Sequence, residues 1–135
     1  MREMQSNREA NILFRLIRIA IGTEGVDALF DADGVEWKRL YEMARKQGVL
    51  AIVFDGLMRI FEVNSELVKS FPQQLKLRWI NAMFSIEQRY NTSREVCAEL
   101  AEKWAEQGVK TLCLKGMAFS TYYPEPSHRE CGDFD

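Results

Sequence analysis

The chain has 135 residues, of which 47% are hydrophobic and 28% charged, the composition of an ordinary globular domain. This excludes a disordered or collagen-like chain. Eighteen Lys and Arg residues stand against twenty Asp and Glu residues, for a net charge of −2. Composition therefore gives no strong signal for a nucleic-acid or anionic-membrane partner.

The sequence also argues against membrane insertion and secretion. The longest apolar run, residues 49–54, is far shorter than the roughly 20 residues that a bilayer-spanning helix requires. The N-terminus has no apolar stretch beside a cleavage site of small residues. Cys97, Cys113 and Cys131 lack the spacing of a zinc or redox motif. We expect a cytoplasmic protein with reduced, packed thiols.

The first part of the chain predicts three helices. Apolar residues recur at helical spacing in residues 6–21, and Gly22 provides a stop. A second stripe follows a possible Asp33 cap and ends before Gly48. It consists of Trp37, Leu40, Tyr41 and Ala44. Residues 49–61 are more apolar, which predicts a third helix buried between its neighbours.

A long helix is predicted over residues 72–107. Asn64 can cap a short turn before it, and no Gly or Pro interrupts the chain after Pro72. Along one side of this helix, a row of residues is spaced alternately four and three positions apart, and we call this row the seam. It consists of Trp79, Met83, Ile86, Tyr90, Ser93, Cys97, Leu100 and Trp104. The seam fits a scaffold helix packed by the first three helices, or a coiled-coil dimer. Aromatic residues and Ser93 at seam positions favour intramolecular packing.

The periodicity changes after Gly108. Residues 109–114 are β-branched and apolar, which predicts a strand that enters a turn at Lys115 and Gly116. A helix over residues 117–123 should end at Pro124. Residues 131–135 predict a second strand. The fold class is therefore α+β but predominantly α, with a helical region over 1–107 and a strand–helix–strand unit over 108–135.

Acidic residues alternate in the last predicted strand. Side chains two positions apart point to the same face of a strand, so Asp133 and Asp135 can share a cation. Magnesium prefers one or two carboxylates together with substrate phosphates. Gly116 lets the backbone approach a phosphate closely, and Lys115 adds a cation. These features fit a magnesium or manganese site beside a phosphate-binding turn, but they equally fit a solvated acidic terminus, and taken alone they do not decide between the two.

The run LKGMAFSTYYPEPSHRECGDFD resembles the family of uncharacterised nucleotidyltransferases, a branch of the polymerase-β-like superfamily. The resemblance is close over residues 109–135 and weaker upstream. It implies a nucleotidyltransferase fold in which Asp133 and Asp135 hold Mg²⁺ or Mn²⁺ and act as the catalytic pair. It further implies that Lys115 and Gly116 stand where the superfamily has its glycine and serine turn.

The chain departs from the superfamily pattern at two points. Met117 follows Gly116, so a hydroxyl contact to phosphate is missing, and the interval from Gly116 to Asp133 is longer than usual. Family members also carry a third carboxylate on a later strand. We therefore expect the chain to be the N-terminal portion of a longer protein, inactive by itself.

Two residues near the acidic pair have further interpretations. Arg129 could clamp a phosphate or pair with Glu130 or Asp133, and the sequence does not choose between these roles. His128 has no second metal ligand nearby, so we expect a surface role for it.

The expected function is metal-dependent transfer of a nucleoside monophosphate from a nucleoside triphosphate to an acceptor that the sequence does not identify. The alternative is a helical protein-interaction module whose nucleotidyltransferase-like unit is degenerate and does not catalyse. Since an unpaired sheet edge attracts another chain, self-association through such an edge is also expected.

Overall fold

The computed structural model describes residues 2–26 and 31–130. The predicted strand over 131–135, with Asp133 and Asp135, lies outside these residues. The chain forms two compact units, residues 1–83 and 84–135, and the boundary between them lies within a long helix. No helix among the described residues is both long and apolar enough to cross a membrane.

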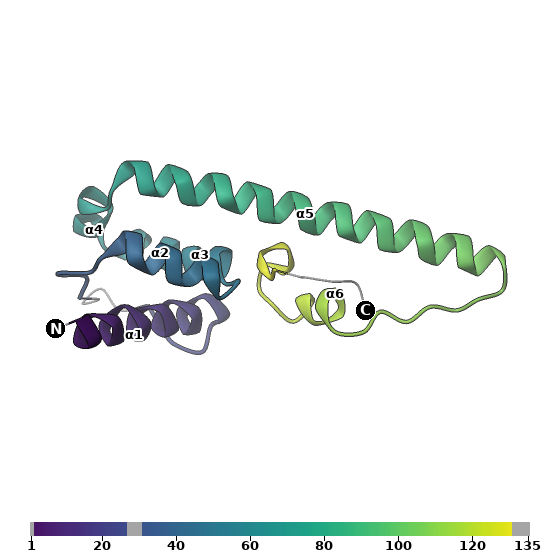
Figure 1. The fold of residues 1–135 in the computed structure, drawn as a ribbon, viewed down its shortest axis with the longest axis horizontal. Helices are drawn as coiled ribbons and strands as arrows, with labels where there is room; N and C mark the ends of the chain where they lie inside the picture. Colours follow the sequence, from purple (N-terminus) through teal and green to yellow (C-terminus); the bar gives the residue numbers. More distant parts are fainter. Residues whose placement is uncertain (1, 27–30, 131–135) are drawn as a thin grey trace. The chain divides into compact units, whose positions relative to one another are not determined.

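Three helices form most of the first unit: α1 (Arg2–Ile21), α2 (Trp37–Lys46) and α3 (Leu50–Val63). They pack side by side, and α4 (Ser65–Ser70) follows α3 (Figure 1). The apolar residues of the three predicted helices form the core. In α1 the spacing of Ile12, Leu13, Leu16, Ile17 and Ala20 predicts the buried side, but Ile17 is only half-buried and Ile19 is fully buried in its place. The predicted helices are therefore confirmed here, with small shifts at their ends.

The backbones of α1 and α3 lie close together at Gly56. A Cβ atom at this position would overlap the carbonyl oxygen of Leu16. Near the same interface, Arg59 Nη1 donates a 2.8 Å hydrogen bond to the carbonyl oxygen of Ile19, close to the end of α1. The apolar pattern predicts that α1 and α3 pack together, but the glycine sets how closely their backbones approach.

Of the two capping residues predicted from the sequence, Asn64 and Asp33, the structure confirms the first. The side chain of Asn64 accepts a hydrogen bond from the backbone N–H of Leu67, as predicted. Asp33 does not cap α2, because the helix begins after Glu36, whose side chain makes no capping bond. Instead, Oε1 of the buried Glu9 in α1 accepts the backbone N–H of Glu36 at 3.4 Å. The start of α2 is therefore hydrogen-bonded to the carboxylate of Glu9, which lies 27 positions earlier in the chain.

The predicted long helix is confirmed as α5 (Gln73–Glu106), which is continuous. In the first unit its fully buried Trp79 donates from Nε1 to the carbonyl oxygen of Leu50 at 2.8 Å. The Trp79 ring also meets Tyr41 edge-on, with ring centroids 5.1 Å apart. Further along, Leu100 and Trp104 are 42% and 46% exposed. The seam is thus tightly packed only near its beginning.

The predicted strand over residues 109–114 is not formed in the described part of the chain, which contains helices, turns and loops. Gly108, with φ +77°, ends α5, and the backbone N–H of Val109 bonds back to the carbonyl oxygen of Trp104. Beyond this cap the side chains are exposed, Leu112 by 80%. A β-prone sequence becomes a strand only when a neighbouring strand accepts and donates its backbone hydrogen bonds.

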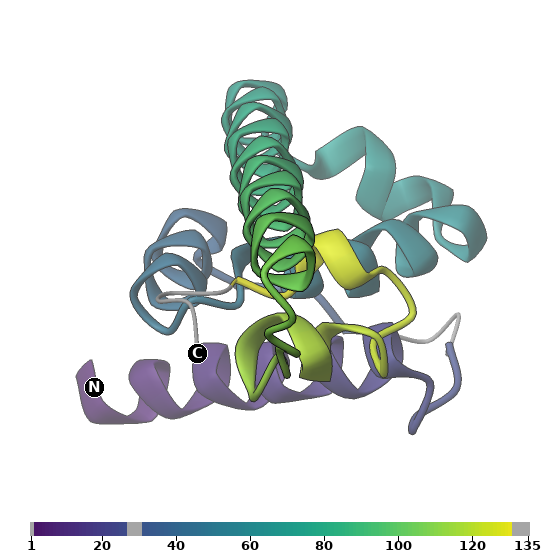
Figure 2. The same cartoon turned by 90° about the vertical axis from the view of Figure 1, so that its right-hand side faces the viewer.

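Two short helices complete the second unit, α6 (Gly116–Ser120) and a 3₁₀ helix over Pro126–His128. They lie on the same side of the second half of α5 (Figure 2). The helix predicted over 117–123 is therefore shorter and begins one residue earlier. Its last expected residues form turns instead, in which the backbone N–H of Tyr123 bonds to the carbonyl oxygen of Ser120.

Candidate functional site

The turn at Lys115 and Gly116 has an unusual backbone. Lys115 has φ +52° and ψ −134°, and it is the one non-glycine residue with positive φ in the described part of the chain. This conformation costs a non-glycine residue about 1–3 kcal/mol and is concentrated at functional sites. The side chain of Lys115 is exposed, whereas Gly116 is half-buried and begins α6. The turn is thus held in a strained geometry by its surroundings.

Arg129 supports this turn from the C-terminal side. Its Nη1 donates a 3.0 Å hydrogen bond to the carbonyl oxygen of Gly116. Its guanidinium carbon also lies 6.0 Å from the centre of the Tyr123 ring, over its face. The structure therefore brings together three of the five predicted site residues: Lys115, Gly116 and Arg129. Arg129 contacts the turn itself, a role that sequence reasoning missed.

His128 is not a surface residue, so this prediction was wrong. Its side chain is buried, and its Nε2 lies 2.7 Å from Glu87 Oε1 in α5. The partner is 41 positions away in the sequence, and local reasoning about the loop could not find it. Next to this pair, Glu130 lies 3.8 Å from Arg89, again on α5. The C-terminal segment is therefore attached to α5 through polar side chains.

A second polar contact attaches α6 to α5. The fully buried hydroxyl of Ser120 lies 2.8 Å from the Tyr90 hydroxyl and donates to the carbonyl oxygen of Met117. A serine hydroxyl has one proton, so Tyr90 must be the donor in the first bond. The sequence predicted Tyr90 as a seam residue but did not predict this use of its hydroxyl.

The two tyrosines before Pro124 differ in burial. Tyr123 is half-buried under Arg129, whereas Tyr122 is 83% exposed. The short α6 ends before this residue, and the turn that follows directs it outward.

The thiols also differ from the expectation of packed side chains. Cys97 is half-buried and Cys113 exposed, and both are free. Burial raises the pKa of the Cys97 thiol, with a smaller contribution from the nearby Cys113.

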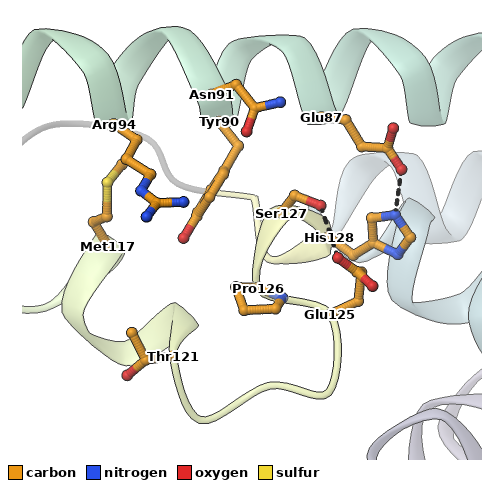
Figure 3. A pocket seen from close by; sticks show the side chains of 10 residues that line it. All are labelled: Glu87, Tyr90, Asn91, Arg94, Met117, Thr121, Glu125, Pro126, Ser127 and His128. Atoms are coloured by element: carbon orange, nitrogen blue, oxygen red, sulfur yellow. Dashed lines mark hydrogen bonds and ion pairs between the residues drawn. The ribbon is translucent and has the colours of Figure 1, made fainter.

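The second unit contains a cavity of about 700 Å³, which is lined in part by Met117, the residue that follows the turn in the chain (Figure 3). Four residues of α5 line one side of it, and residues between Met117 and His128 line the other. The α5 residues are Glu87, Tyr90, Asn91 and Arg94. They follow the spacing i, i+3, i+4 and i+7, the one sequence signal that could have identified this face of the helix.

The described residues contain no cluster of three or more His, Cys, Asp or Glu side chains that could hold a metal ion. The predicted ligands Asp133 and Asp135 lie outside these residues. Their carboxylates are the oxygen donors that magnesium takes in proteins, so the predicted donor set fits the ion by its chemistry.

Comparison with known proteins identifies the chain at the level of a family. No curated protein and no solved structure matches it. A family model, however, covers residues 33–135 and includes α2 to α6 as well as the two aspartates. Since this match extends over more than half of the chain, the protein belongs to the family described as uncharacterised nucleotidyltransferase.

Proposed function

We propose that this protein is a metal-dependent nucleotidyltransferase that transfers a nucleoside monophosphate from a nucleoside triphosphate to an acceptor. The observation that carries this proposal is the family match over residues 33–135, which contains both the Lys115 turn and the two aspartates. In this reaction an acceptor hydroxyl oxygen attacks the α-phosphorus. The bond from that phosphorus to the oxygen bridging to the β-phosphate breaks, pyrophosphate leaves, and the hydroxyl proton passes to solvent.

Asp133 and Asp135 would hold Mg²⁺ or Mn²⁺, which supplies charge stabilisation for the attacking and leaving oxygens. Both aspartates are therefore proposed as the catalytic pair. Lys115 would place positive charge beside the triphosphate, because its side chain is exposed at the turn, directly before α6. Gly116 would allow a phosphate close to the backbone, since no side chain stands between them.

Two roles are open for Arg129, a phosphate clamp and pairing with an acidic residue. Its contact with Gly116 supports the first. Its Nη1 donates a 3.0 Å hydrogen bond to the carbonyl oxygen of Gly116, and this contact with the turn supports a role in phosphate binding. We propose that Arg129 positions the turn and adds positive charge to the triphosphate site. The strained backbone of Lys115 is consistent with a turn held for binding.

The proposal is tested by calorimetric titration of the full-length protein with ATP, CTP, GTP and UTP, each with and without Mg²⁺. We expect at least one triphosphate to bind more tightly with Mg²⁺. Asp133→Asn should abolish this coupling, because a carboxamide is a poorer magnesium ligand. Asp33→Asn, an exposed position in the first unit, serves as the matched control. Equal affinity for wild type and Asp133→Asn, with and without Mg²⁺, would exclude the proposed function.

A second candidate is the interaction module without catalysis. It is favoured by the exposure of Leu112 and Leu114, which are 80% and 55% accessible. In this case two copies would associate through residues 109–114. Sedimentation equilibrium of the full-length protein should then detect a dimer that Leu112→Glu dissociates, and a monomer at every concentration would contradict this candidate.

A further inference from the structure

The cavity of the second unit contains polar groups that the proposed nucleotide site does not use. Figure 3 shows Arg94 and Asn91 extending from α5 toward it, on the same helix face. Residues three positions apart on a helix are neighbours, so the guanidinium and the carboxamide can contact one ligand group together. Neither side chain makes a hydrogen bond or an ion pair within residues 2–26 and 31–130.

The other polar groups of the cavity are already engaged. Glu87 contacts His128 at 2.7 Å, and the Tyr90 hydroxyl contacts Ser120. Across the cavity, a carboxylate oxygen of Glu125 accepts a 3.4 Å hydrogen bond from the Ser127 hydroxyl. The cavity therefore presents an arginine and an amide on its α5 side and a carboxylate acceptor on the opposite side.

This arrangement indicates the chemistry of a ligand. A guanidinium is a planar fork of donors that matches a carboxylate or a phosphate, and the Asn91 amide adds another donor. The Glu125 carboxylate accepts hydrogen bonds, as from hydroxyl groups of a ligand. The complementary molecule carries an anionic group at one end and hydroxyl groups at the other. The volume of about 700 Å³ falls within the range of small-molecule pockets.

The cavity is next to the proposed nucleotide site in the chain. Met117, which lines it, directly follows Gly116, and His128 directly precedes Arg129. We propose that this cavity binds the acceptor, a small hydroxylated molecule bearing a carboxylate or a phosphate, with Arg94 and Asn91 on its anionic group. The acceptor role rests on the proposed nucleotidyl transfer, whereas binding of the anion does not.

The test is calorimetric titration of the full-length protein, without nucleotide or metal, with inorganic phosphate, gluconate, glucose 6-phosphate and glucose. At least one of the three anions should bind, and glucose should bind far more weakly. Arg94→Gln should weaken anion binding about tenfold or more, the effect of losing charge-assisted hydrogen bonds. Lys103→Gln removes a positive charge from the same helix outside the cavity lining and should leave affinity unchanged.

Tighter binding of gluconate than of the two phosphates indicates a carboxylate ligand. Tighter binding of inorganic phosphate or glucose 6-phosphate indicates a phosphate ligand. The proposal is overturned if none of the three anions binds to wild type, or if Arg94→Gln binds them as wild type does. It is also overturned if Arg94→Gln weakens binding of the magnesium triphosphate equally, because the cavity would then belong to the nucleotide site. Anion binding by a wild-type protein that shows no magnesium-coupled triphosphate binding would overturn the acceptor role together with the proposed function. Asp133→Asn, by contrast, should lose the magnesium-coupled triphosphate binding and still bind the anion.

Discussion

The Nε2 atom of His128 lies 2.7 Å from Oε1 of Glu87, so the 3₁₀ helix at the end of the described chain is bonded to the middle of α5. The histidine side chain is only 8% exposed and the glutamate 36%. Because His128 is buried, loss of the Glu87 carboxylate would leave the imidazole without a hydrogen-bond partner at this nitrogen. The pair therefore contributes to the attachment of the C-terminal segment.

Removal of this carboxylate should destabilise the second unit. Glu87→Ala is expected to lower the free energy of unfolding by about 1–3 kcal/mol, because the buried imidazole loses its partner. Urea denaturation followed by circular dichroism measures the change. Glu99→Ala, an exposed position on α5, should change the free energy by less than about 0.5 kcal/mol. Similar effects for the two variants would contradict a structural role for the pair.

The contact between α1 and α3 should not tolerate a methyl group at Gly56. A Cβ there would overlap the carbonyl oxygen of Leu16, so the helices must separate. Gly56→Ala is expected to destabilise the protein by about 1–3 kcal/mol, although alanine normally favours a helix. Thermal denaturation provides the measurement. Gly25→Ala, where nothing lies within 4 Å of the added atom, is the control, and a stable Gly56→Ala protein would refute the close approach.

Acid should weaken the contact between Glu24 and the end of α1. The hydrogen bond from Arg18 Nε, at 2.9 Å, is the main cause that lowers the pKa of Glu24 below 4.5, and Arg15 adds to the effect. A lowered pKa contributes stability above the unfolded-state value, and this stability is lost as the pH falls through the folded-state pKa.

Glu24→Gln should therefore be less stable than wild type near pH 7. The difference should shrink below about pH 4.5 and vanish once wild-type Glu24 is protonated. Urea titrations of both proteins at a series of pH values measure it. A difference that is independent of pH would show that the loss comes from packing and not from charge.

The two described thiols should react at different rates. Burial raises the pKa of Cys97, which lowers its thiolate fraction, whereas Cys113 is exposed. In the Cys131→Ser background, iodoacetamide at pH 8 should modify Cys113 first. Peptide mass spectrometry over time distinguishes the two sites. Faster modification of Cys97 would contradict the burial that the structure assigns to it.

Much of the helical architecture follows from local patterns. The apolar stripes predict α1, α2 and α3, and the absence of Gly and Pro after Pro72 predicts the continuous α5. These features depend on the spacing of neighbouring residues, which the sequence displays directly. The resemblance over residues 109–135 led to the family that the comparison confirmed.

The candidate site was predicted only in part. Lys115, Gly116 and Arg129 were expected to act near one another, and the structure joins Arg129 to the turn. The role of Asp133 and Asp135 stays a prediction, because both lie outside the described residues. Glu87, Asn91 and Arg94 were missed because charged residues on a long helix are usually solvated, and nothing in the local sequence marks a cavity beside them.

By itself the sequence determined where the long helices form and which family the chain belongs to. Tertiary structure decided that His128 is buried against Glu87, that Ser120 meets Tyr90 and that residues 109–114 do not form a strand among the described residues. Helical hydrogen bonds close within four residues, so their signals are local. A buried polar pair or a strand requires partners far away in the chain, and only folding brings these together.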